Sequence, residues 1–150
     1  MKNCGVVIRP ANMFDVPKIN VIEHEAFPTP WSFESLFSDI VLNKNTKYFA
    51  AVAGGTLIGY GGMWFVEDEC HITNVAVKKE FQRQGIASRI MQKLILTAQN
   101  LNARTMMLEV RRSNLAAQKL YTGLDFVEIS VRRNYYSNPV EDALILRKTL

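Results

Sequence analysis

A short segment, residues 82–87, constrains the fold of this chain more than any other feature of its sequence. It reads Gln-Arg-Gln-Gly-Ile-Ala, follows an apolar run over residues 72–77, and opens a helical pattern marked by Ile86, Ile90, Leu94, Ala98 and Leu101. A strand that passes through glycine into a helix leaves the first helical N–H groups without partners, beside the positive end of the helix dipole. Gly85 lacks a Cβ, so the backbone can approach a ligand closely. The segment predicts a phosphate-binding loop; a basic turn before an ordinary helix is the alternative.

The spacing excludes two common phosphate loops. A Walker loop requires Gly-Lys-Ser/Thr, whereas Gly85 is followed by Ile-Ala. A dinucleotide fingerprint requires three spaced glycines that open a helix, whereas Gly59, Gly61 and Gly62 lie inside a strand-like run. If the loop binds phosphate, it therefore belongs to another class of site.

Size and composition bound the class of protein. With 150 residues, 48% of them hydrophobic and 21% charged, we expect one globular domain over residues 1–150. No apolar run approaches the roughly 20 residues that span a bilayer, and the apolar stretch near the N-terminus is too short for a signal peptide. Cys4 and Cys70 form no C-x-x-C pair, which favours reduced thiols in the cytoplasm. The net charge of +4 suits an anionic cofactor as well as a nucleic acid.

Hydrophobic periodicity predicts alternating strands and helices. Asn12 is expected to cap a helix that runs to about residue 26, with buried positions at Phe14, Ile19, Ile22 and Ala26, and Ser32 is expected to cap a second short helix. Further helices are predicted over residues 86–101 and after Asn114, and strands over residues 6–8, 48–53, 56–66, 70–77, 106–110, 126–132 and 143–146. This order predicts an α/β (α+β mixed) fold, with a mostly antiparallel mixed sheet of about seven strands and helices on both faces.

Several segments carry a resemblance to a known family. The loop at residues 82–87 resembles the pyrophosphate loop of the GNAT acetyltransferases. Segments that resemble the RimI-type ribosomal-protein alanine N-acetyltransferases are residues 25–32 (Glu-Ala-Phe-Pro-Thr-Pro-Trp-Ser), residues 108–114 (Leu-Glu-Val-Arg-Arg-Ser-Asn) with Ala117, Leu120 and Tyr121, and residues 132–136 (Arg-Arg-Asn-Tyr-Tyr) followed by Glu141, Asp142 and Ala143. The similarity covers nearly the whole chain and implies the GNAT acyl-CoA N-acyltransferase fold.

Two positions depart from the family pattern. The family has glycine before the phenylalanine that follows the tyrosine segment, whereas this chain has Asp125 before Phe126. Aspartate tolerates the left-handed backbone moderately well, so we expect a small local strain there. Gln82 replaces an arginine of some relatives at the start of the pyrophosphate loop.

The resemblance implies two catalytic residues. Glu109 matches the general base, and Tyr121 matches the proton donor to the departing thiolate. On the residues alone, Glu109 has the alternative of an exposed strand position paired with Arg111 or Arg112, and Tyr121 that of a core aromatic. A free α-amine, with a pKa near 8, is partly neutral at pH 7, so one carboxylate acting through water is enough for it.

The resemblance also implies the residues that hold acetyl-CoA. The strand whose backbone holds the pantetheine arm matches Val75, Ala76 and Val77, and the pyrophosphate loop matches Arg83, Gln84, Gly85, Ile86, Ala87 and Ser88. Asn114 matches a cofactor-contacting asparagine, and it can cap a helix at the same time. A buried strand and a plain helix cap are the alternatives.

The acceptor is expected to contact aromatic and basic side chains, namely Trp31, Arg133, Tyr135 and Tyr136. The alternatives are a hydrophobic staple for Trp31 and a solvated basic strand end for the other three. His24 and His71 match no motif, and without a third ligand at metal spacing we interpret them as structural.

The sequence thus predicts an acetyl-CoA-dependent N-terminal acetyltransferase without a metal, acting by direct transfer. Its predicted acceptor is the N-terminal alanine of a small-subunit ribosomal protein, and neither a membrane nor a nucleic acid is an expected partner. Two alternatives stay open: an acetyltransferase for lysine side chains or small amines, and a non-catalytic basic module that binds RNA or a protein.

Overall fold

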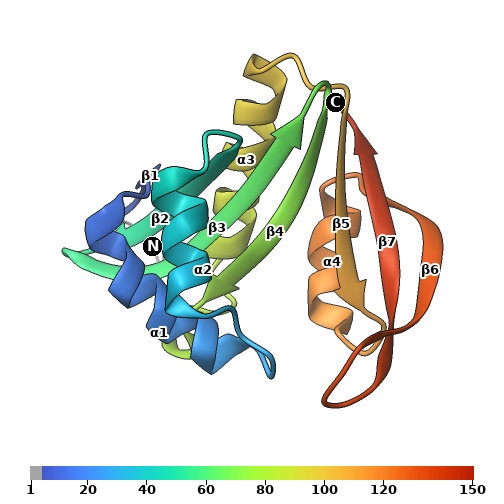
Figure 1. The fold of residues 1–150 in the computed structure, drawn as a ribbon, viewed down its shortest axis with the longest axis horizontal. Helices are drawn as coiled ribbons and strands as arrows, with labels where there is room; N and C mark the ends of the chain where they lie inside the picture. The colour runs from blue at the N-terminus through green and yellow to red at the C-terminus, as the bar shows by residue number, and fades with distance from the viewer. Residues whose placement is uncertain (1–4) are drawn as a thin grey trace.

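The computed structural model describes residues 5–150, so the prediction for Cys4 lies outside the described residues. Seven strands form one sheet (Figure 1): β1 (Val6–Pro10), β2 (Thr46–Ala53), β3 (Thr56–Val66), β4 (Glu69–Val77), β5 (Thr105–Arg111), β6 (Val127–Tyr136) and β7 (Glu141–Thr149). The helices are α1 (Val16–Ala26), α2 (Phe33–Phe37), α3 (Ile86–Asn100) and α4 (Leu115–Gly123). None of these helices within the described range is long and apolar enough to cross a membrane.

The order of strands in the sheet is β1-β2-β3-β4-β5-β7-β6. The pair β4–β5, which the crossover through α3 connects, is parallel, and the other neighbours are antiparallel. A parallel pair requires such a crossover, and antiparallel hairpins need only short turns. The predicted mixed, mostly antiparallel sheet is confirmed.

The sheet opens between β4 and β5. These strands pair only at three positions, Glu69 with Thr105, Cys70 with Met106, and His71 with Met107, and then diverge toward the carboxyl ends of both strands (Figure 1). On its other edge β4 pairs with β3 along its whole length, as β5 does with β7. The two halves of the sheet are therefore each held firmly while the seam between them splays.

A β-bulge marks the point at which β4 turns away. Gly62 of β3 pairs with Asn74 and its neighbour Met63 pairs with Ile72, so Thr73 is an extra residue in β4. An extra residue bends the bulged strand and increases its twist. The bulge follows His71, the last residue of β4 that pairs with β5, and it gives a physical reason for the divergence.

Helices cover both faces of the sheet, as predicted (Figure 1). Neighbouring strand residues point to opposite faces, and accordingly Ile58 packs in a cluster with Ile90 and Leu94 of α3, while Leu57 packs in a second cluster with Ile19 of α1. The central strands are thus buried on both sides. This burial holds the backbone around the seam in place.

Local signals place most helix ends where the sequence predicts them. The Ser32 side chain accepts a hydrogen bond from the Ser35 N–H at 3.1 Å and caps α2. Asn12 caps a short 3-10 turn, Met13–Asp15, which leads into α1. Because this turn shifts the helical phase, the prediction that Phe14 is buried is wrong, and its side chain is 79% exposed. Ala26 is also exposed, at the end of α1.

The predicted left-handed residue before Phe126 is present. Asp125 has φ +69°, and its N–H donates to the carbonyl of Thr122 at 3.0 Å. The segment after α4 therefore keeps its turn without the glycine of the family pattern, at the cost of mild backbone strain.

Glycines in β3 serve close packing. A Cβ at Gly61 would lie 2.5 Å from a methyl carbon of Ile90 in α3, and one at Gly62 would lie 2.2 Å from the ring of Tyr48. Tyr48 is buried, and its hydroxyl donates to Asp39 at 2.8 Å, so the ring has little freedom to move. Gly61 thus lets α3 pack close to the sheet, and Gly62 leaves room for the Tyr48 ring of β2.

We predict that Gly62→Ala lowers the free energy of unfolding by about 1–3 kcal/mol, because overpacking forces the Tyr48 ring out of place. Urea denaturation measures the effect. Gly123→Ala is the matched control, since a Cβ there meets no heavy atom within 4 Å. Equal losses of stability in the two variants would contradict the packing argument.

Candidate active site

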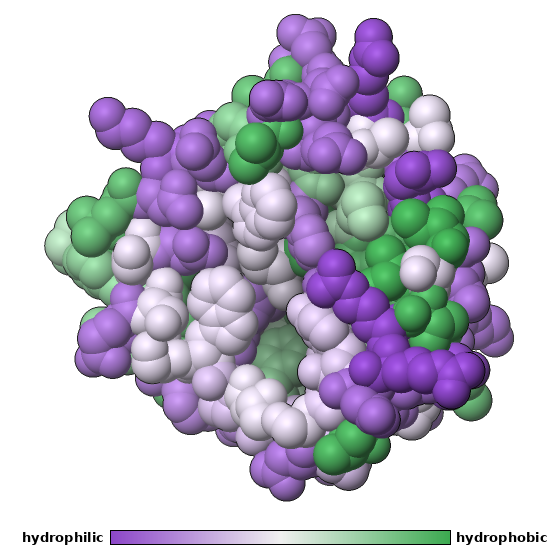
Figure 2. Space-filling model, turned by 45° about the vertical axis from the view of Figure 1, so that its right-hand side comes forward, coloured by the Kyte–Doolittle hydropathy of each residue, from purple (hydrophilic) through white to green (hydrophobic). Residues whose placement is uncertain are grey.

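A cavity of about 530 Å³ opens at the seam between β4 and β5. Its walls come from both strands, the segment after α1, the start and middle of α4, and the end of β6; they include Glu23, Trp31, Trp64, His71, Asn74, Val75, Glu109, Asn114, Tyr121, Tyr135 and Tyr136. The face drawn in Figure 2 is hollowed, and side chains of intermediate hydropathy surround the hollow, as expected for walls of tryptophan and tyrosine. The divergence of the strands therefore creates a site that brings together residues far apart in the sequence.

Glu109 points into this cavity from the middle of β5. Its side chain is 17% exposed, and its two carboxylate oxygens lie 2.9 Å and 2.8 Å from Nε2 of His71 on β4. The alternative of pairing with Arg111 or Arg112 is wrong, because these arginines form ion pairs with Glu141 and Asp142 respectively. The carboxylate is thus free of cationic guanidinium partners, which would weaken it as a base.

Tyr121 lines the same cavity from α4. Its ring packs edge to face against Phe126, with centroids 5.8 Å apart. Burial raises the pKa of Tyr121 to about 12, so its hydroxyl keeps its proton at any physiological pH. The alternative, a core aromatic, is also partly right: Tyr121 belongs to the large apolar cluster and borders the cavity as well.

Asn114 is placed to serve both roles that the sequence left open, a helix cap and a cofactor contact. Its Oδ1 accepts a hydrogen bond from the Ala117 N–H at 3.1 Å and so caps α4, and the same residue lines the cavity. The cap fixes the start of the helix that carries Tyr121.

The predicted pyrophosphate loop has the backbone form that anion binding needs. Arg83 and Gly85 both have left-handed φ angles, +64° and +78°, and α3 begins directly afterwards at Ile86. Among residues 5–150 no side chain caps this helix, so the N–H groups of its first turn can donate to a ligand. The Gln82 side chain donates to the Val77 carbonyl at 3.0 Å and ties the loop to the end of β4.

The predicted cofactor residues fall into two groups around this loop. Val75, Ala76 and Val77 lie on β4 beyond its last pair with β5, next to the open seam, and Val75 lines the cavity. Gln84, Ala87 and Ser88 flank the start of α3 and are half-buried, while the Ile86 side chain belongs to the core. The open backbone edge of β4 fits the thioester end of acetyl-CoA, and the uncapped start of α3 fits its pyrophosphate. Of these two groups, Val75 lines the cavity, and the binding of acetyl-CoA by the other residues stays a prediction.

Aromatic side chains line the cavity from two sides, the segment after α1 and the end of β6. Trp31, Tyr135 and Tyr136 line the cavity, as the sequence predicts, whereas the exposed Arg133 is outside its lining. The β6–β7 register shifts between Arg132 and Tyr136, so regular strand alternation could not have placed Arg133. Tyr136 packs edge to face against Tyr135 with centroids 5.0 Å apart.

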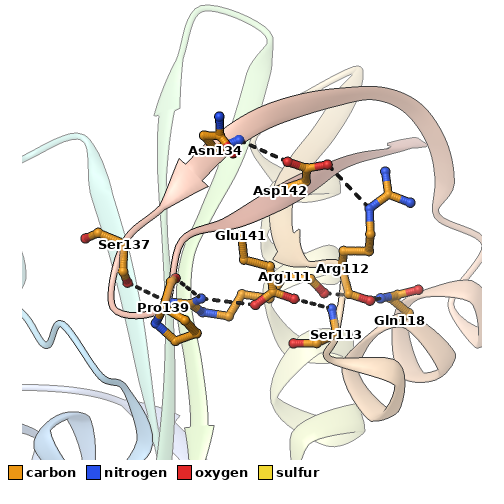
Figure 3. A network of polar contacts seen from close by, with 9 residues as sticks. All are labelled: Arg111, Arg112, Ser113, Gln118, Asn134, Ser137, Pro139, Glu141 and Asp142. Atoms are coloured by element: carbon orange, nitrogen blue, oxygen red, sulfur yellow. Dashed lines mark hydrogen bonds and ion pairs between the residues drawn. The ribbon is translucent and has the colours of Figure 1, made fainter.

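A polar network anchors the end of β6, which carries Tyr136, to β5 (Figure 3). The Arg111 guanidinium lies over the Tyr136 ring, 4.4 Å from its centroid, and donates to Glu141 and to the carbonyls of Ser137 and Pro139, each at 3.1 Å. Glu141 also accepts from the Ser113 N–H at 2.5 Å. The turn between β6 and β7 is therefore fixed relative to the strand that carries Glu109.

Sequence reasoning missed Glu23, a carboxylate that is 1% exposed and lines the cavity. It accepts hydrogen bonds from the Trp31 N–H at 2.9 Å, from the Asn74 amide at 2.8 Å and from the Tyr60 hydroxyl. Buried charges require such partners. Glu23 thus joins α1, the Trp31 segment and the bulge in β4; its position one helical turn after Ile19 is the signal that predicts burial.

Sequence reasoning also interpreted His71 as structural, and the structure places it in the cavity against Glu109. Its ring stacks on Trp64, with centroids 5.1 Å apart. Strand alternation gives no guide here, because the bulge at Thr73 interrupts it: Thr73 contacts Tyr48, whereas Val75 packs against the cluster that contains α3. The register between two diverging strands cannot be read from the sequence. His24, in contrast, is exposed and contacts the carbonyl of Asn20 at 2.8 Å.

Comparison with known proteins defines the class. The model of the acetyltransferase (GNAT) family matches residues 16–126, and the chain belongs to this family. It is an acetyl-CoA-dependent N-acetyltransferase, which agrees with the fit of the β4 edge and the α3 start to such a donor.

Particular relatives lie within one group of that family. The chain is 33% identical over 143 residues, 95% of each protein, to a Bacillus subtilis (strain 168) protein provisionally named ribosomal protein bS18-alanine N-acetyltransferase. It is 35% identical over 136 residues to the ribosomal protein bS18-alanine N-acetyltransferase of Escherichia coli (strain K12), covering 88% of this chain and 89% of that one. The crystal structure of the ribosomal-protein-S18-alanine N-acetyltransferase from Escherichia coli superposes with a TM-score of 0.89 at 32% identity, covering 96% of this chain and 93% of that chain.

We predict that Glu23→Gln lowers the free energy of unfolding by about 1.5–3 kcal/mol, because the amide replaces a charged acceptor of several hydrogen bonds and turns a donor toward one of them. Thermal or urea denaturation measures the change. Glu25→Gln, at an exposed position of the same helix, is the control. A Glu23→Gln variant as stable as the control would refute the role of the buried carboxylate.

Proposed function

We propose that this enzyme transfers the acetyl group of acetyl-CoA to the α-amine of a protein N-terminus, and that its acceptor is the N-terminal alanine of the small-subunit ribosomal protein bS18. The names of the relatives that match 88–95% of the chain support this acceptor. We further propose that residues 1–150 act as one domain and that the enzyme works in the cytoplasm, where ribosomal proteins are made.

The observation that carries the proposal is the position of Glu109 and Tyr121 on the walls of one cavity, the first on β5 and the second on α4. In the proposed reaction the neutral amine attacks the thioester carbonyl, and Glu109 accepts the amine proton directly or through water. Tyr121 donates a hydrogen bond or a proton to the leaving thiolate. An α-amine, with an ordinary pKa near 8, reaches its neutral form far more readily than lysine, with a pKa near 10.4, so a single carboxylate is an adequate base.

Direct transfer is favoured over an acyl-enzyme. Cys70 is buried and is 1% exposed, and burial raises the pKa of its thiol. A nucleophilic cysteine needs the opposite, a depressed pKa and access to the substrate. The acetyl group is therefore proposed to pass from sulfur to nitrogen in one enzyme complex.

The walls of the cavity suggest how an N-terminus binds. Trp31, Tyr135 and Tyr136 offer flat apolar surfaces with polar edges, and the Arg111 charge beside them is already paired with Glu141. The buried Glu23 and Glu109 give the interior a negative potential, which favours an approaching ammonium group. Backbone N–H groups of β4 next to the seam are proposed to polarise the thioester carbonyl.

The acceptor prediction is tested with a peptide panel and acetyl-CoA. We expect a peptide that begins with the bS18 alanine to gain one acetyl group, detected by mass spectrometry. We expect no gain for the same peptide with a blocked N-terminus and a free lysine, because the cavity contains no base matched to a lysine ammonium. Acetylation of the lysine peptide alone would contradict the proposed acceptor class and support the lysine alternative.

The base prediction is tested with Glu109→Gln. Removal of a general base costs a factor of about 10²–10⁴, so we expect kcat to fall by that range. The dissociation constant of acetyl-CoA, measured by calorimetry, should change little, since Glu109 lies on the acceptor side of the seam. A variant with unchanged turnover would remove Glu109 from the mechanism.

A further inference from the structure

One side-chain pair crosses the seam exactly where the strands separate: His71 on β4 and Glu109 on β5. His71 is the last β4 residue that pairs with β5, and its partner there is Met107. Glu109 follows Met107 two residues later on β5. Nε2 of His71 is 2.9 Å from Oε1 and 2.8 Å from Oε2 of Glu109, and the side chains are 25% and 17% exposed. The pair is therefore partly shielded from water and close enough for a strong hydrogen bond.

The imidazole is held on its other side by Trp64. His71 and Trp64 are direct partners in the β3–β4 register, and their rings stack at an angle of 24° with centroids 5.1 Å apart. A ring stacked on one side and hydrogen-bonded at one edge has a defined orientation. It can therefore define the orientation of the carboxylate that it contacts.

The chemistry of the pair assigns the protons. An ionised carboxylate only accepts hydrogen bonds, so Nε2 must carry the hydrogen in both the neutral and the charged imidazole. Nδ1 takes no part in this contact, so the hydrogen bond holds the carboxylate through one defined ring atom.

We propose that His71 is a positioning residue for acetyl transfer: its Nε2–H donates to the Glu109 carboxylate and aims it across the seam toward the acceptor amine. This inference rests on the proposed function of Glu109. In the reaction Glu109 takes the amine proton while the N–C bond forms and the C–S bond breaks. Tyr121 donates a hydrogen bond or a proton to the leaving thiolate, and the proton on Glu109 passes through solvent to whichever of these two lacks one.

Other charged and titratable groups face the cavity. They are Glu23 from α1, Tyr121 from α4, Tyr135 and Tyr136 from β6, and Arg111 from β5. Burial and the nearby Glu109 raise the pKa of Tyr136 to about 12, and burial raises that of Tyr121 to about 12, so both stay neutral. Arg111 is paired with Glu141.

The test is the rate of acetyl transfer to an Ala-starting acceptor peptide at saturating acetyl-CoA and pH 8, compared between variants of His71. His71→Gln keeps an N–H donor for the Glu109 carboxylate, so we expect it to keep most of the wild-type kcat.

A second variant tests the hydrogen bond itself. We expect His71→Phe, which retains a ring against Trp64 but has no donor, to lower kcat at least about tenfold at pH 8 with little change in the KM for acetyl-CoA. His71→Gln should recover much of that loss. His24→Gln, at an exposed histidine of α1, is the control and should keep the wild-type rate.

The outcomes separate this inference from the proposed function. A His71→Phe variant as fast as the wild type at pH 8, or a His71→Gln variant as slow as His71→Phe, would overturn the positioning role while the acetyltransferase assignment stands. A wild-type enzyme that acetylates no N-terminal peptide would overturn the proposed acceptor, and this inference with it. A slow His71→Phe variant whose loss is largely recovered in His71→Gln supports the inference.

Discussion

The brief pairing of β4 with β5 is the constraint on which the rest of the structure depends. Two parallel strands meet over three residue pairs, from Glu69 to His71 on β4, and then part where Thr73 forms a bulge. An unpaired strand edge inside a protein leaves polar backbone groups unsatisfied. Here the parting strands border a cavity, so these groups can serve a ligand. Part of a strand edge is thereby left open to a ligand instead of pairing with a neighbouring strand.

The elements around the seam are held in place more firmly than the seam itself. The apolar clusters on both faces of the sheet fix β3, β4 and β5, and the Arg111–Glu141 network fixes the turn that follows Tyr136. On the other wall, Glu23 joins Trp31 to the bulged strand. Each wall of the cavity therefore has its own anchor, and an acceptor and a donor can approach the seam from different sides without either wall having to rearrange.

Most of the fold could be predicted from periodicity and capping residues, since Ser32, Asn114 and Gly85 mark helix starts that the structure contains. Phe14 could not be placed, because a 3-10 turn that depends on the Arg9–Asp15 contact changes the phase of the first helix. These are local failures, in which a tertiary contact overrides a local pattern.

Sequence motifs identified candidate site residues that lie within one segment of the chain. They did not identify contacts that depend on how two separate segments are aligned in the sheet. Glu109 and Tyr121 lie in recognisable stretches, and both line the cavity. The contact between His71 and Glu109 depends on the register of two strands separated by α3, and the burial of Glu23 depends on donors that come from three other elements. The contact between His71 and Glu109 leaves no mark within a single stretch of sequence, and the spacing of Glu23 from Ile19 indicates burial without identifying its partners.

Hydrogen–deuterium exchange with and without coenzyme A tests the central claim most directly, namely that the opened seam receives the thioester end of the donor. The account predicts slower amide exchange in residues 73–77 of β4 and in the first turn of α3 when coenzyme A is saturating, because both segments then donate to the bound molecule. Protection confined to other parts of the chain, with β4 and the start of α3 unchanged, would contradict it.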